Sequence, residues 1–142
     1  MRRPEVFLSH STGDRRLATR LARALRRRGI QVWYSRSHLK AGQQWHDEIG
    51  RALARCRWFL VLLSPSAVRS KWVKHEVLYA LREDRYVGRI VPLLCRPCDE
   101  KKLSWTLGGV QRADFTHGFE SGLAQLFAVR GFASMSRPRS RM

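Results

Sequence analysis

Apolar and polar positions follow one another along this chain in blocks that predict strands and helices in turn. The clearest block is residues 58–63, an unbroken apolar run with the length of a strand that is buried on both faces. Pro65 ends this strand because proline has no amide hydrogen to donate to a sheet. Apolar residues then recur at helical spacing and predict a helix that buries one face and ends near residue 84. That face consists of Val73, Val77, Ala80 and Leu81.

Seven further segments continue the alternation. Strands are predicted at residues 6–8, 30–34, 89–95 and 110–115, and helices at residues 14–28, 44–55 and 119–129. Asp14 is placed to cap the start of the first helix, and Gly29 to end it in the left-handed conformation. Pro92 indicates that the fourth strand lies near an edge of the sheet or carries a bulge.

Strands that alternate with helices predict an α/β fold, a parallel sheet with helices on both faces. Five strands in 142 residues favour the flavodoxin-like order 2-1-3-4-5. The order then reverses between the first and third strands, where open sheets of this kind bind ligands. The length suits one domain, which we place at residues 1–133. Residues 134–142 form a basic tail that we expect to be disordered.

The loops at this switch point are residues 9–14 and 64–76, and the second contains a candidate for chemistry. Trp72 and Glu76 are four residues apart, so they lie on the same side of the predicted helix near its start. A carboxylate beside an indole ring at this edge of the sheet is typical of a ligand site. The alternative is structural: Glu76 would pair on the surface with Lys71 or Lys74, and Trp72 would pack in the core.

The charge is strongly positive, with 28 basic and 11 acidic residues and a formal net charge of +17. This balance fits either a surface for polyanions or a genome that favours arginine codons, since 23 of the basic residues are arginine. The densest cluster lies opposite the apolar face of the first helix and has no aromatic residues between its members. We therefore do not expect nucleic acid as a main partner. The cluster is Arg15, Arg16, Arg20, Arg23, Arg26, Arg27 and Arg28.

Localisation and metal binding follow from similar counts. The longest apolar run is too short to cross a bilayer, which takes about 20 residues, and the first residues do not resemble a signal peptide. We therefore expect a cytoplasmic protein without membrane contact.

Three cysteines give no disulfide framework. Cys95 and Cys98 form a C-x-x-C pair, which is either a redox dithiol or, as we favour, two reduced thiols. The sequence has no second pair of ligands at a suitable spacing, so we expect no metal site.

Four segments, in order, resemble the motifs of Toll/interleukin-1 receptor (TIR) domains. Residues 6–11 together with Asp14 look like the first motif of the family. Residues 32–42 resemble the second strand and the loop that the family uses for contacts, although Ser35 stands where the family often has an acidic residue. Residues 62–66 and 70–76, the third and fourth segments, resemble the part of the family that carries its W-x-x-x-E. The resemblance covers residues 5 to about 130 and is to bacterial TIR proteins.

The resemblance implies an NAD⁺ glycohydrolase or cyclase that cleaves the nicotinamide–ribose bond, with an immune, antiphage role. NAD⁺ is then a substrate, and no cofactor is expected. Expected partners are other TIR domains through self-association, and an upstream sensor or a downstream effector. Glu76 would be the catalytic residue. The residues expected to bind substrate are Ser9, His10, Ser11, Asp14, Trp72, Ser35 and Gly42.

The chemistry suits a single carboxylate. Nicotinamide leaves NAD⁺ as a neutral group and needs no general acid, whereas glycoside cleavage usually needs two carboxylates. Glu76 would stabilise the positive charge that develops on the ribose. The main rival is a TIR module that only binds other TIR domains, through residues 35–43 and 44–55. A phospho-receiver is excluded because the first and third strands end in Ser9 and Ser64, without the carboxylates that hold Mg²⁺.

Overall fold

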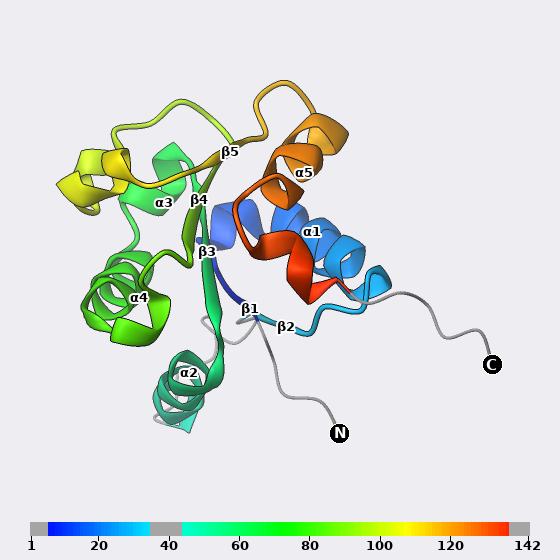
Figure 1. Cartoon of the computed structure of the whole chain (residues 1–142). Helices are drawn as coiled ribbons and strands as arrows, with labels where there is room; N and C mark the ends of the chain where they lie inside the picture. Colours follow the sequence, from blue (N-terminus) through cyan, green and yellow to red (C-terminus); the bar gives the residue numbers. More distant parts are fainter. Residues whose placement is uncertain (1–5, 35–43, 137–142) are drawn as a thin grey trace.

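The computed structural model describes residues 6–34 and 44–136, with side chains in the second range from Glu48 onward. Its centre is a five-stranded parallel sheet in the order β2-β1-β3-β4-β5, which confirms the predicted fold (Figure 1). The strands are β1 (Val6–Ser9), β2 (Val32–Tyr34), β3 (Trp58–Leu63), β4 (Ile90–Leu94) and β5 (Ala113–Asp114).

Five α-helices and several short 3₁₀ turns connect the strands. The helices are α1 (Arg15–Arg27), α2 (Gln44–Arg55), α3 (Pro65–Val68), α4 (Lys71–Arg82) and α5 (Phe119–Phe127). The 3₁₀ turns are η1 (Thr12–Asp14), η3 (Asp84–Tyr86), η4 (Glu100–Lys102), η5 (Trp105–Gly109) and η6 (Phe132–Met135). Gly29 follows α1 with a φ of 81°, as its predicted role at the helix end requires. None of the helices in the described ranges has the length and apolar character to span a membrane.

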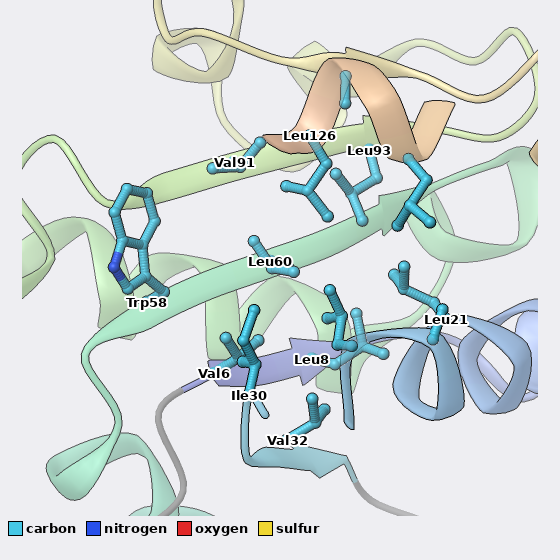
Figure 2. Close-up of a cluster of buried hydrophobic side chains, with 14 of the residues drawn as sticks. Val6, Leu8, Leu21, Ile30, Val32, Trp58, Leu60, Val91, Leu93 and Leu126 are labelled. Carbon is cyan, nitrogen blue, oxygen red and sulfur yellow. The ribbon is translucent and has the colours of Figure 1, made fainter. Parts of the chain in front are cut away.

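The sheet separates two apolar cores because successive residues of a strand point to opposite faces. In β3, Leu60 and Leu62 pack toward α1 and α5, whereas Phe59 and Val61 pack toward α2 and α4. Figure 1 shows α1 and α5 on one side of the sheet and α2, α3 and α4 on the other. Figure 2 shows the first core, in which side chains of α1 and α5 meet those of the strands. All six residues of β3 are buried, as the central position of the strand requires.

Pro92 lies in β4, the strand next to the edge strand β5, which agrees with the prediction that its strand lies near an edge of the sheet. It pairs with Val61 of β3, and β4 has β5 on its other side. Cys95 N donates toward β3, whereas Leu94 O accepts from Phe115 N, so the amide position of Pro92 faces β5. The pairing of β4 with β5 begins only at the residue after Pro92, where Leu93 pairs with Ala113. The missing amide hydrogen therefore lies where no partner strand is present.

The folded part of the chain extends further than the predicted start of a tail at Ser134. The 3₁₀ turn η6 brings Phe132 and Met135 into the first core, where both are buried. The Phe132 ring meets Trp58 edge to face, with 5.2 Å between ring centroids. Residues 134–136 thus belong to the domain, and the remainder of the expected tail lies outside the described residues.

Candidate active site

Glu76 lies on the buried face of α4, although its side chain is acidic. It is 2% exposed, between the buried Val73 and Val77 on the same helix. Lys71 and Lys74 are exposed, whereas Glu76 is not the surface carboxylate of the structural alternative. The helix start is fixed by Ser70, whose hydroxyl accepts a hydrogen bond of 3.2 Å from Val73 N. A carboxylate therefore occupies a buried position of α4. Its burial is unfavourable unless the group accepts hydrogen bonds.

Ser9 holds this carboxylate from the neighbouring sheet. Its hydroxyl donates a hydrogen bond of 2.6 Å to Oε1 of Glu76, and Ser9 is itself 1% exposed. The distance is in the range of charge-assisted O–H···O⁻ bonds. Ser9 is the last residue of β1, so the bond joins the carboxyl end of that strand to α4. Two residues from the predicted site, 67 positions apart in the chain, are thus in direct contact.

Asp14 connects the two loops at the switch point. Its Oδ2 accepts hydrogen bonds of 2.9 Å from the Ser11 hydroxyl and 2.5 Å from the Ser64 hydroxyl. Asp14 is the N-cap residue of α1, as predicted, but its side chain makes no capping hydrogen bond to this helix. The carboxylate is turned instead toward β3, because two hydroxyl donors converge there. Asp14 therefore holds the β1–α1 loop against the start of α3.

Ser64 was not identified as a positioning residue from the sequence. Its hydroxyl also accepts a hydrogen bond of 3.1 Å from Ala67 N and so caps α3, with Pro65 at the first helical position. The sequence signal for this cap is a serine followed directly by proline, a pair that also marks the end of a strand. The two loops are also in close contact at Gly13, where a Cβ would lie 2.7 Å from the Ser66 hydroxyl oxygen.

A hollow of about 290 Å³ opens between these loops. His10 contributes to it and is 2% exposed, with its ring centroid 5.9 Å from that of Tyr34. Trp72 is half-buried at its border. Glu76 does not line the hollow and lies one helical turn from Trp72. The described lining residues are His10, Ser11, Thr12, Ser66, Arg69, Ser70 and Trp72.

Arg69 was also missed by the sequence analysis. It follows α3, is exposed, and is the cationic side chain among the described residues around this hollow. No helical or strand periodicity marks it, because it lies in the short connection between α3 and α4. A guanidinium here is suited to bind phosphate oxygens of a ligand.

The C-x-x-C pair lies close to the same edge of the sheet, and burial makes its two thiols weaker acids. Burial raises the pKa of the Cys95 thiol to about 12, and burial also raises the pKa of Cys98. Thiols with raised pKa values are poor nucleophiles at neutral pH, because the thiolate is the reactive form. Both cysteines are free in the structure. The geometry thus favours the simpler interpretation of two reduced thiols.

The predicted site residues are thus distributed as follows. The structure joins Ser9 to Glu76 and Ser11 to Asp14, and it places His10 and Trp72 at one hollow. Ser35 and Gly42 lie outside the described residues. Within residues 6–34 and 48–136, no group of three metal-ligating side chains is arranged to hold an ion. The roles of these residues in substrate binding remain predictions.

Comparison with characterised proteins finds bacterial relatives. A 2′ cyclic ADP-D-ribose synthase, BtTIR of Bacteroides thetaiotaomicron, is 35% identical over 74 residues, covering 51% of this chain and 26% of the relative. The NAD(+) hydrolase PdTIR of Paracoccus denitrificans is 30% identical over 92 residues, covering 63% of this chain and 30% of the relative. The chain therefore spans between 26% and 30% of the length of these two relatives.

Comparison with solved structures identifies the same fold. The TIR domain of the Toll-related receptor TRR-2 from Hydra magnipapillata superposes with a TM-score of 0.69 at 19% sequence identity. The match covers 92% of this chain and 96% of that domain. A family model described as TIR domain matches residues 6–127, which is most of the chain. The chain therefore belongs to the TIR domain family.

Proposed function

We propose that this TIR domain is an NAD⁺ nucleosidase or cyclase, and that it cleaves the nicotinamide–ribose bond with Glu76 as catalytic residue. The observation that carries the proposal is the buried Glu76 carboxylate, held by Ser9 at the carboxyl edge of the sheet. A carboxylate at this edge is placed where α/β sheets bind ligands. The relatives BtTIR and PdTIR, whose names describe a 2′ cyclic ADP-D-ribose synthase and an NAD(+) hydrolase, support the same chemistry.

The role of Glu76 is electrostatic. When the bond to nicotinamide breaks, positive charge develops on the ribose, and a carboxylate in a water-poor site stabilises this charge. The electron pair of the bond leaves with nicotinamide, which becomes neutral and needs no proton. The ribose carbon is then attacked by water, giving ADP-ribose, or by an oxygen or nitrogen of the same molecule, giving a cyclic product. Both outcomes use the same first step.

Burial of Glu76 requires a rearrangement when substrate binds. At 2% exposure, the carboxylate meets a ribose hydroxyl only if the helix start moves to uncover it, while Ser9 keeps its hydrogen bond to Oε1. We propose that self-association with further TIR domains drives this change and so activates the enzyme. In this arrangement His10, Ser11 and Trp72 border the bound nucleotide, Arg69 binds its phosphate oxygens, and Asp14 keeps the two loops together.

The biological role we propose is bacterial immune signalling against phage. A domain that consumes NAD⁺ must be silent until it is triggered, and a buried catalytic group gives such a resting state. The trigger would be an upstream sensor or assembly itself, and the product would act on the cell directly or through a downstream effector.

The test is release of nicotinamide from NAD⁺ by the purified chain. Glu76→Gln removes the charge with little change in size, and we expect the rate to fall by about 10²- to 10³-fold. Glu120→Gln is the matched control, because Glu120 is an exposed glutamate on α5 and should keep the full rate. Equal rates for the wild type and Glu76→Gln would exclude the catalytic role.

A second function is favoured by the same burial. If Glu76 only fastens α4 to β1, the chain is a binding module that assembles with other TIR domains and performs no chemistry. Rates measured across a wide range of protein concentrations decide between the two. The enzyme should show a specific rate that rises with concentration as it assembles. Chains that associate, as seen by light scattering, and yet release no nicotinamide at any concentration would establish the binding module.

A further inference from the structure

A basic hollow of about 490 Å³ lies at the opposite edge of the sheet from Glu76. Arg57 directly precedes the first residue of β3, and Arg89 directly precedes the first residue of β4. Arg130 completes the group from the turn after α5. Because the strands are parallel, their amino ends share one edge, whereas Ser9 and Glu76 lie at the carboxyl edge. This hollow is therefore separate from the candidate active site.

The three arginines bring positive charge together without a counter-charge. The described lining of the hollow includes no carboxylate, and none of the three forms an ion pair with the described residues. Arg57 and Arg130 are exposed, and Arg89 is half-buried, with Nη1 donating to Arg85 O at 3.3 Å. Guanidinium groups that line one hollow offer the kind of donors that phosphate oxygens accept from.

Two glycines keep the rim of this hollow open. Gly88 and Gly131 have φ angles of 74° and 85°, a conformation that favours glycine. A Cβ built on Gly88 would have no atom within 4 Å, so the space beside its backbone is free. A ligand can therefore approach the main chain here between the arginine side chains.

An apolar hollow of similar volume, about 490 Å³, adjoins the basic one. The two share Val87, Gly88 and Arg130, and Val87 on this shared wall is 77% exposed. This second hollow is bordered by Leu81, Ile90, Val110 and Val129, and also by Glu83, whose carboxylate is 3.6 Å from the guanidinium of Arg85. A ligand with an anionic group at one end and a flat, weakly polar ring at the other would place the anionic group in the basic hollow and the ring in the apolar one.

We propose that these adjoining hollows bind a nucleoside diphosphate, with its phosphates on Arg57, Arg89 and Arg130 and its base against Ile90 and Val129. The site is distinct from the one proposed for NAD⁺ and does not depend on that function. It gives the domain a place at which a nucleotide binds without being cleaved.

Isothermal titration calorimetry of the full chain with ADP tests the site. Arg57→Gln/Arg130→Gln should weaken ADP binding by about tenfold or more, because two charge-assisted contacts to phosphate are lost. Arg51→Gln/Arg82→Gln is the matched control: both residues are exposed, lie outside both hollows and remove the same charge. Val87→Glu places a carboxylate on the shared exposed wall and should also weaken binding, without affecting the fold.

Three further measurements complete the test. Inorganic pyrophosphate should bind more weakly than ADP, and adenosine should not bind measurably, if both hollows contribute. In a Trp72→Ala background, which disables the hollow next to Glu76, ADP should still bind, and Arg57→Gln/Arg130→Gln should still weaken that binding. The proposal is overturned if ADP does not bind, if both double variants lose affinity equally, or if Trp72→Ala and not the Arg57/Arg130 pair abolishes binding. In the last case, ADP occupies the hollow next to Glu76.

Discussion

Single side chains at the switch point are held by hydroxyl donors, and Ser9 is the most informative of them. Its hydrogen bond to Glu76 is buried at both ends, so loss of the hydroxyl leaves a carboxylate oxygen that water reaches poorly. A buried polar group that loses a partner costs about 1–3 kcal/mol. Stability and activity are therefore linked at this one bond.

Ser9→Ala should lower the free energy of unfolding by about 1–3 kcal/mol and slow nicotinamide release by about tenfold, because the carboxylate is no longer positioned. Urea denaturation and the nicotinamide assay measure the two effects. Ser121→Ala, an exposed serine of α5, should change stability by less than about 0.5 kcal/mol. A Ser9→Ala protein with wild-type stability would show that the hydrogen bond contributes nothing to the fold.

Two helical glycines give a paired prediction on packing. A Cβ on Gly122 in α5 would lie 2.3 Å from the Phe115 ring, whereas a Cβ on Gly50 in α2 would meet nothing within 4 Å. Gly122→Ala should destabilise the domain by about 1–3 kcal/mol through overpacking. Gly50→Ala should stabilise it by about 1 kcal/mol, because alanine has the higher helix propensity. Thermal unfolding compares them, and a stabilising Gly122→Ala would show that the Phe115 ring moves freely.

At the level of elements, the charge pattern of α1 is unusual. Its 13 residues include six arginines and no acidic side chain, and its first turn begins with Arg15 and Arg16. Like charges three or four positions apart destabilise a helix, and cations are unfavourable near its start. Some of the guanidinium groups lie over aromatic rings. The Cζ atom of Arg20, for example, is 4.0 Å from the centroid of the Phe119 ring. Packing of the opposite face against the sheet must therefore maintain this helix.

Arg23→Glu should stabilise the domain at low salt by about 0.5–1 kcal/mol. Arg23 has Arg20, Arg26 and Arg27 three or four positions away, so a glutamate turns three repulsive pairs into attractive ones. Arg23→Gln should give a smaller gain. The gain should shrink at 1 M salt, where the Debye length is about 3 Å. Urea denaturation at two salt concentrations measures this, and a gain independent of salt would attribute the effect to helix propensity instead.

The elements that could be predicted from sequence are those with an uninterrupted pattern. Residues 58–63 and 44–55 form β3 and α2 with the predicted bounds, because one is continuously apolar and the other has clear helical spacing. The short helix α3 was missed because four residues contain no full period. The strand at residues 110–115 shortens to Ala113–Asp114, since pairing with β4 begins only at Leu93.

The burial of Glu76 could have been found from its position. It follows Val73 by three residues and precedes Ala80 by four, so helical spacing places it on the same apolar face. The contact with Ser9 could not be found in this way, because it depends on how α4 crosses the end of β1. The same holds for Asp14 and Ser64, whose contact spans 50 positions of the chain. Local pattern thus predicts a face, and tertiary packing decides which side chains meet on it.

For the whole molecule, the thiols and phenol in and around the two cores predict how stability depends on pH. Burial raises the pKa of Cys56 from its ordinary value of 9.0 to about 12, and that of Cys95 likewise to about 12. Burial also raises the pKa of Tyr86, whose hydroxyl donates to Leu53 O at 2.5 Å. The folded state therefore keeps protons that the unfolded state releases as the pH rises.

The contribution of these groups to stability should accordingly be complete at neutral pH and fall as the pH rises through 9 toward 12. Urea midpoints at pH 7.5, 9 and 10.5, with reductant present, measure this decline. Cys56→Ala should reduce its slope, since one of the titrating groups is removed, although the variant will be less stable at every pH. A midpoint that does not change between pH 9 and 10.5 would show that these groups titrate alike in both states.

The proline in β4 has a consequence for how copies of this domain meet. A foreign strand that joins a sheet needs an uninterrupted row of amide donors, and Pro92 removes one where β5 has not yet begun. The sheet should therefore resist lengthening by strand exchange along this margin, which disfavours amyloid-like stacking of these domains. Any ordered filament of these domains should consequently be held by side chains and loops, with each sheet remaining separate from its neighbours.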